Sequence, residues 1–142
     1  MIGIDYMKQY LGKQEVKDKT ELRAFFRAHA IKNDIDIDPS KVAWCAAMVN
    51  ACERAAGKPG TGKLLAQSFN KYGKEVLCKD ARPGDIVVFH FPTDKPGHGH
   101  VTYFVAWDDA NNKVKCLGGN QRDEVNISVY SHDHIIHIRR CD

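Results

Sequence analysis

The apolar residues of this chain change their spacing about halfway along it, and this change restricts the fold more than any other feature of the sequence. In the first half they recur at helical spacing, as at Leu22, Phe25 and Phe26. The same spacing continues from about Trp44 to Ala56, where Gly57 is placed to end a helix. We therefore expect the first half to be helical, including the charged segment that leads into Leu22.

Short runs rich in β-branched and aromatic residues fill the second half, with Gly, Asn, Asp and Pro turns between them. These runs lie at 86–89, 101–107, 114–117, 125–130 and 135–138. A further short helix is expected over 63–72, where Gly73 would stop it. The connections between the runs are too short for crossover helices, so neighbouring strands should be antiparallel. The sequence predicts an α+β fold with N-terminal helices packed on an antiparallel β-sheet.

Length and charge limit the classes of function. The 142 residues fit a single domain, 1–142, and are too few for two. A formal net charge of +3, spread along the chain, argues against a nucleic-acid partner. No apolar stretch approaches the roughly 18 residues of a membrane span, and the start lacks the apolar core of a secretory signal. We expect a monomer made in a cytoplasm without a signal peptide, which reaches any external target after release or delivery.

One of the five cysteines stands where a thiol could be reactive. Their number is odd and no C-x-x-C pair occurs, so neither a disulfide framework nor a Cys-rich zinc site is indicated. Cys45 lies at the expected start of a helix, where free N–H groups and the helix dipole stabilise a thiolate. The alternative is a small buried apolar residue, which is what most unpaired cysteines are.

A nucleophilic cysteine needs a base, and His100 stands at the entry of a strand after a glycine turn. It could equally be an ordinary strand residue, and His98 offers a second imidazole two positions away. Asn120, on the following strand, could orient the imidazole if antiparallel pairing brings it beside His100. Its Gly-Gly-Asn segment could also be only a turn.

Four fragments occur in order along the chain: WCAA at 44–47, RPGDIVVF at 82–89, GHV at 99–101 and LGGNQ at 117–121. Together they resemble the CHAP and NlpC group of papain-like cysteine amidohydrolases. The likeness is greatest to short endolysin-like cell-wall hydrolases of phages and prophages.

The resemblance implies a papain-like fold and a Cys-His-Asn mechanism on an amide or peptide bond of bacterial peptidoglycan. Cys45 would be the nucleophile, His100 the base and Asn120 the group that orients it. This mechanism requires no cofactor, and we expect no metal ligands. Three residues are candidate substrate contacts: Trp44, Ser68 and Gln121. Trp44 could instead belong to the core.

Two other classes of function stay open. One is a papain-like hydrolase or acyltransferase acting on a protein or a small amide, such as a delivered antibacterial toxin. The other is a non-enzymatic wall-binding or nucleic-acid-binding domain in which Cys45 is structural.

Two ligand-binding patterns are incomplete. The segment 57–64 approaches a phosphate-binding loop, but Leu64 replaces the required hydroxyl and the segment follows a helix. Asp34, Asp36 and Asp38 alternate as in a calcium loop, but the sixth-position Gly and twelfth-position Glu are missing. We expect a solvated acidic loop there.

Overall fold

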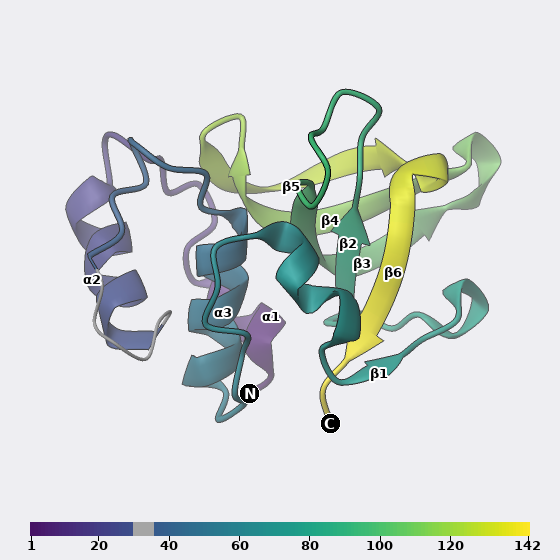
Figure 1. Ribbon diagram of the computed structural model, residues 1–142, viewed down its shortest axis with the longest axis horizontal. Helices are drawn as coiled ribbons and strands as arrows, with labels where there is room; N and C mark the ends of the chain where they lie inside the picture. The colour runs from purple at the N-terminus through teal and green to yellow at the C-terminus, as the bar shows by residue number, and fades with distance from the viewer. Residues whose placement is uncertain (30–35) are drawn as a thin grey trace.

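The computed structural model describes residues 1–29 and 36–142 and shows an α+β protein. Helices come first in the chain and strands afterwards, as the sequence predicted (Figure 1). The helices are α1 (Gly3–Lys8), α2 (Lys19–His29), α3 (Cys45–Ala55) and the 3-10 helix η1 (Ala66–Lys71). The strands are β1 (Lys74–Glu75), β2 (Ile86–Phe89), β3 (His100–Asp108), β4 (Lys113–Gln121), β5 (Glu124–Ser131) and β6 (Ile135–Arg140). Short 3-10 turns lie at Cys78–Asp80, Asp109–Asn111 and His132–His134.

The six strands form one antiparallel sheet in the order β1-β6-β2-β3-β4-β5. The last strand of the sequence, β6, is thus inserted between β1 and β2. The sheet is twisted and curved: in Figure 1, β6 runs from the top toward the bottom of the view, whereas β5 runs across it. Curvature of this kind gives the sheet two faces that are packed in different ways.

A separate apolar core fills each face of the sheet. On one face α3 packs against β3 and β4, and its Met48 joins Val101 and Leu117 in the larger core. On the other face a smaller core forms around Phe89 and Cys116. Residues 45–49 at the start of α3 are buried on all sides, which explains why this part of the helix is wholly apolar.

Gly119 lets α3 approach β4 closely. A Cβ atom added to Gly119 would lie 2.7 Å from the ring of Trp44 and 3.0 Å from Met48 Cβ. Real Cβ atoms do not approach other atoms so closely, so only glycine fits here. Gly119 therefore allows the beginning of α3, with Cys45, to lie against the sheet.

The segment before α2 differs from the expected helix. Helix α2 begins only at Lys19, because the preceding chain docks on the sheet instead. Gly12 adopts a left-handed φ of 85° and donates to Val125 O at 2.8 Å, and Gln14 forms a bridge with Glu124. These contacts with β5 use main-chain groups that a helix would need for itself. The other short helix also differs, since 66–71 is a 3-10 helix.

No helix in the described part of the chain is long and apolar enough to cross a membrane.

Candidate active site

Cys45 is the first residue of α3, and its side chain is only 5% exposed. No side chain caps this helix start, so its first N–H groups are free for other partners. The N–H groups of Ala46 and Val101 are directed at the Cys45 sulfur. The thiol therefore lies at the junction of α3 and β3, among donors that favour its ionised form.

His100 begins β3 and forms a hydrogen bond with Cys45. Its side chain is 9% exposed, so the two groups meet in a site that is largely closed to water. The neighbouring imidazole considered earlier, His98, is exposed and lies on the loop between β2 and β3. The structure thus brings together Cys45 and His100, the two residues considered above as nucleophile and base.

Burial and charge act against each other in this pair. Burial alone would raise the pKa of Cys45, but the hydrogen bond and charge of His100 oppose it, helped by the two main-chain N–H groups. The resulting pKa of Cys45 lies below the ordinary 9.0. Burial would lower the pKa of His100, but hydrogen bonding and charge from Cys45, with a hydrogen bond from Gln121, raise it above 6.5. Both shifts favour a thiolate beside an imidazolium.

Two other buried thiols have shifts in the opposite direction. Burial raises the pKa of Cys52 well above its ordinary value, helped by the charge of Glu53. Burial also raises the pKa of Cys116 to about 12. Burial without a cationic partner therefore suppresses a thiolate, and His100 is what distinguishes Cys45.

Gln121 supplies the amide that contacts the imidazole. Its Oε1 lies 3.0 Å from His100 Nε2. Its Nε2 donates to Asn126 O at 2.7 Å and to Asn126 Oδ1 at 2.9 Å, which fixes the orientation of the amide. The amide oxygen therefore faces His100 and accepts the Nε2 proton, so that Nδ1 of the neutral ring carries the lone pair.

Gln121, and not Asn120 as we expected, occupies the position beside the imidazole. Asn120 has a left-handed φ of 59°, and the pairing of β4 with β5 shifts register between Gly118 and Gln121. A bulge of this kind changes which side chain faces the neighbouring strand. In the described residues no side-chain hydrogen bond joins Asn120 to His100, and Gln121, expected as a substrate contact, takes that place.

Tyr130 is a contact that the sequence analysis missed. Its hydroxyl lies 3.2 Å from His100 Nε2, and its ring packs against Phe89 and Phe91. Burial raises the pKa of Tyr130, so the phenol stays neutral. The signal in the sequence was weak, because Tyr130 is one of several alternating residues on β5.

The other two expected substrate contacts are engaged in the fold. Trp44 is completely buried, and its Nε1 donates to Glu15 Oε1 at 3.0 Å, so it belongs to the core. The hydroxyl of Ser68 lies 2.8 Å from that of Thr61 and holds η1 against the preceding loop. In the described residues, neither side chain forms a hydrogen bond with Cys45 or His100.

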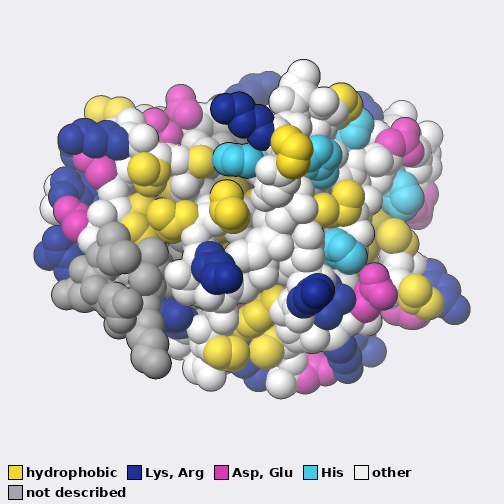
Figure 2. Space-filling view, viewed as in Figure 1, with side chains coloured by type: hydrophobic (Ala, Val, Ile, Leu, Met, Phe, Trp, Pro, Cys, Tyr) yellow, Lys and Arg dark blue, Asp and Glu magenta, His cyan; other side chains and the backbone are white. Residues whose placement is uncertain are grey.

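A polar cluster holds the loop that leads into His100. Gln67 Nε2 donates to His98 O at 2.7 Å, and His90 Nδ1 lies 2.9 Å from the same oxygen. Figure 2 shows several histidine side chains on the part of this face where the strands lie. The cluster connects η1 to the entry of β3.

The described acidic residues that were considered as calcium ligands have partners within the protein. Asp36 pairs with Arg23 and Arg27, and Asp38 accepts hydrogen bonds from Ser40. Asp34 lies outside the described residues. Within residues 1–29 and 36–142, no cluster of three or more His, Cys, Asp or Glu side chains is arranged to hold a metal ion.

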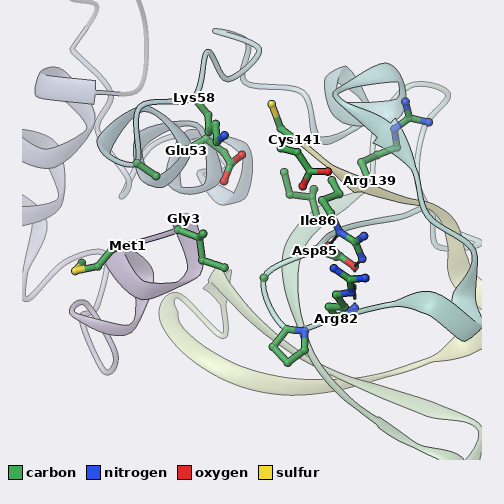
Figure 3. Close-up of a pocket in the computed structure, with 15 residues that line it drawn as sticks. Met1, Gly3, Glu53, Lys58, Arg82, Asp85, Ile86, Arg139 and Cys141 are labelled. Atoms are coloured by element: carbon green, nitrogen blue, oxygen red, sulfur yellow. Dashed lines mark hydrogen bonds and ion pairs between the residues drawn. The ribbon is translucent and has the colours of Figure 1, made fainter.

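A pocket of about 210 Å³ lies away from the thiol, beside the C-terminal end of α3 (Figure 3). Glu53 points into it, opposite Arg82 and Asp85 of the segment that leads into β2. Neither Cys45 nor His100 lines this pocket. The Cys45–His100 pair and the pocket are therefore separate features.

A comparison with protein-family models finds none that matches this chain, and a comparison with curated proteins finds no match either.

Proposed function

We propose that this protein is a papain-like cysteine hydrolase of the CHAP and NlpC type that cleaves an amide or peptide bond of bacterial peptidoglycan. The observation that carries the proposal is the contact of Cys45 with His100, in which the pKa of the thiol is lowered although the side chain is buried. Perturbed titration of this kind is typical of reactive sites. The order of the sequence fragments is a second, independent support.

Cys45 is the nucleophile in this proposal, and His100 moves the protons. The sulfur attacks the carbonyl carbon of the amide, and His100 passes the proton of the thiol to the leaving nitrogen. His100 then takes a proton from water, which attacks the thioester, and returns that proton to the sulfur. Gln121 orients the ring throughout by accepting the Nε2 proton.

Charge on the carbonyl oxygen would be stabilised at the start of α3. The first intrahelical bond there is Met48 N–H to Trp44 O, at 3.0 Å. The earlier N–H groups are not used by the helix, and that of Cys45 itself lies beside the reacting carbon. It is the natural first donor of an oxyanion hole.

Peptidoglycan as the substrate rests on the resemblance of the fragments to cell-wall hydrolases. The net charge of +3 favours approach to an anionic polymer. A hydrolase that acts on proteins or small amides would use the same chemistry. The identity of the nucleophile and the identity of the substrate therefore need separate experiments.

The nucleophile is tested by the pH dependence of iodoacetamide labelling, followed by mass spectrometry. A thiol reacts as its thiolate, so the labelling rate rises with pH through the pKa. We expect the midpoint for Cys45 to lie below 9.0 and to rise in His100→Ala, while exposed Cys78 serves as the internal reference. An unshifted midpoint in the wild type contradicts the proposed nucleophile.

The substrate is tested by digesting purified cell walls and identifying the new termini by mass spectrometry. Wild type and His98→Ala should release fragments, while Cys45→Ala and His100→Ala should release none. If Cys45 is reactive but the walls stay intact, the cysteine mechanism still holds. The assignment of peptidoglycan as the substrate is then contradicted.

A further inference from the structure

The pocket beside the C-terminal end of α3 has opposite charges on two of its sides (Figure 3). Glu53 of α3 points into it from one side, and Arg82, on the segment that leads into β2, lies on the other. Apolar side chains of Ile2, Pro83 and Ile86 also line it. Its volume of about 210 Å³ is below the roughly 300–1,000 Å³ usual for drug-sized ligands, so it suits a smaller molecule.

Glu53 is almost completely buried and has no cationic partner. It is 5% exposed, and its two oxygens accept hydrogen bonds from Tyr103 and Tyr72. In residues 1–29 and 36–142, no ion pair joins this carboxylate to a cationic side chain. Lys58, which also lines the pocket, acts on it only at longer range. Each carboxylate oxygen can accept a second hydrogen bond, so Glu53 can still bind a cation that enters the pocket.

Arg82 is the opposite case, a cation without an anionic partner. Its guanidinium forms no ion pair within the part of the chain that the structure describes. The neighbouring carboxylate of Asp85 is neutralised by Arg140, which donates to it through Nε at 2.7 Å and through Nη2 at 2.8 Å. Arg82 therefore keeps its guanidinium donors for an anion in the pocket.

We propose that this pocket binds a small zwitterion, with the ammonium of the ligand at Glu53 and its carboxylate at Arg82. These two protein charges face the pocket from opposite sides and do not pair with each other. A ligand that carries one ammonium and one carboxylate satisfies both, whereas a ligand with a single charge leaves one of them without a partner. A free amino acid and a dipeptide both have this chemistry.

The titration of Glu53 is consistent with a missing cation. Burial raises its pKa above the ordinary 4.5, because the hydrogen bonds from the two tyrosines do not offset the loss of water. An ammonium group beside the carboxylate would favour the ionised form and lower this pKa. Neither Cys45 nor His100 lines the pocket, so the proposed zwitterion site does not depend on the proposed reaction.

The test is isothermal titration calorimetry of four probes against the full chain. L-alanine and L-alanyl-L-alanine carry both charges, whereas propionate and propylamine each carry one. We expect at least one zwitterion to bind, and the singly charged probes to bind roughly tenfold or more weakly, as for the loss of a hydrogen bond to a charged group. The tighter of the two zwitterions shows which separation of charges the pocket prefers.

Four variants locate the site. Glu53→Gln and Arg82→Gln should each weaken the binding of the zwitterion by roughly tenfold or more. Lys79→Gln removes an exposed cation that does not line the pocket, and Cys45→Ala removes the candidate nucleophile, so both should bind as the wild type does. Arg82 is exposed, so Arg82→Gln should fold normally and gives a clear result even where Glu53→Gln is unstable.

Amide chemical shifts in NMR spectra give a second readout of the position. The signals of Gly3 and Gly84, which line the pocket, should move when the zwitterion is added, and that of Ile127 on β5 should not. The proposal is overturned by a protein that binds neither zwitterion, by equal binding of the singly charged probes, or by wild-type affinity in Arg82→Gln. Binding that disappears in Cys45→Ala would place the probe at the candidate active site and also overturn it.

Discussion

The Nε2 atom of His100 is held by two side chains, Gln121 and Tyr130, that come from different strands. Gln121 is itself fixed by Asn126, whose Oδ1 also accepts from Ser128 at 2.6 Å. A chain of hydrogen bonds therefore runs from the surface of β5 to the imidazole. It leaves Nδ1 of the neutral ring to take the proton of the thiol.

This arrangement predicts different effects for two adjacent residues. Gln121→Ala removes the acceptor for the Nε2 proton, so the ring loses its preferred tautomer, and kcat should fall by about 10²-fold. Asn120→Ala leaves that bond intact and should retain nearly full activity. Gln121→Glu keeps an acceptor oxygen and should restore part of the loss. Equal losses in the Ala variants, measured as kcat on cell-wall fragments, would contradict the role of Gln121.

At the scale of elements, the distance between α3 and β4 decides where the thiol lies. Gly119→Ala would bring a methyl group to 2.7 Å from Trp44 and 3.0 Å from Met48 Cβ, so α3 must move. Overpacking of this kind costs about 1–3 kcal/mol. We expect a lower free energy of unfolding in urea and slower labelling of Cys45.

A control separates loss of stability from displacement of the helix. A Cβ at Gly97 meets nothing within 4 Å, but its φ of 82° is left-handed. Gly97→Ala should therefore cost about 1 kcal/mol through the backbone alone and leave the labelling of Cys45 unchanged. If both variants slow the labelling alike, close packing at Gly119 does not position the thiol.

Elements with strong local signals were predictable, and those set by tertiary contacts were not. The buried strands and α3 follow from apolar spacing, and the resemblance of the fragments led to the contact of Cys45 with His100. The bulge before Gln121 depends on how β4 meets β5. Residue spacing alone therefore could not show that Gln121, and not Asn120, contacts His100. The contact of residues 12–15 with β5 could not be predicted for the same reason. Strand β1 has only two residues, which is too short for an alternating pattern.

At the scale of the whole molecule, Glu53 joins parts of the chain that are far apart. Its carboxylate accepts from Tyr103 at 2.6 Å and from Tyr72 at 3.1 Å, and it lies against Gly3 of α1. Burial raises its pKa more than these hydrogen bonds lower it, so the pKa lies above the ordinary 4.5. The folded protein therefore holds this proton more tightly than the unfolded chain does.

The sign of the pH effect follows. A carboxyl with a raised pKa favours folding while protonated, and this contribution is lost as the pH rises through the folded pKa. The free energy of unfolding of the wild type, relative to Glu53→Gln, should therefore decrease as the pH rises above 4.5. Urea titrations of both proteins at several pH values give this difference. A difference that is constant or increases would contradict the raised pKa.

The insertion of β6 between β1 and β2 affects how the protein is made. A chain still on the ribosome, with β6 inside the exit tunnel, has β2 open on one side and lacks Ile138 from the smaller apolar core. The sheet can be completed only after β6 emerges, although Cys45 and His100 have by then long been translated. During synthesis the protein thus exposes an incomplete β-sheet, and the completed sheet that carries His100 forms only after β6 has been released.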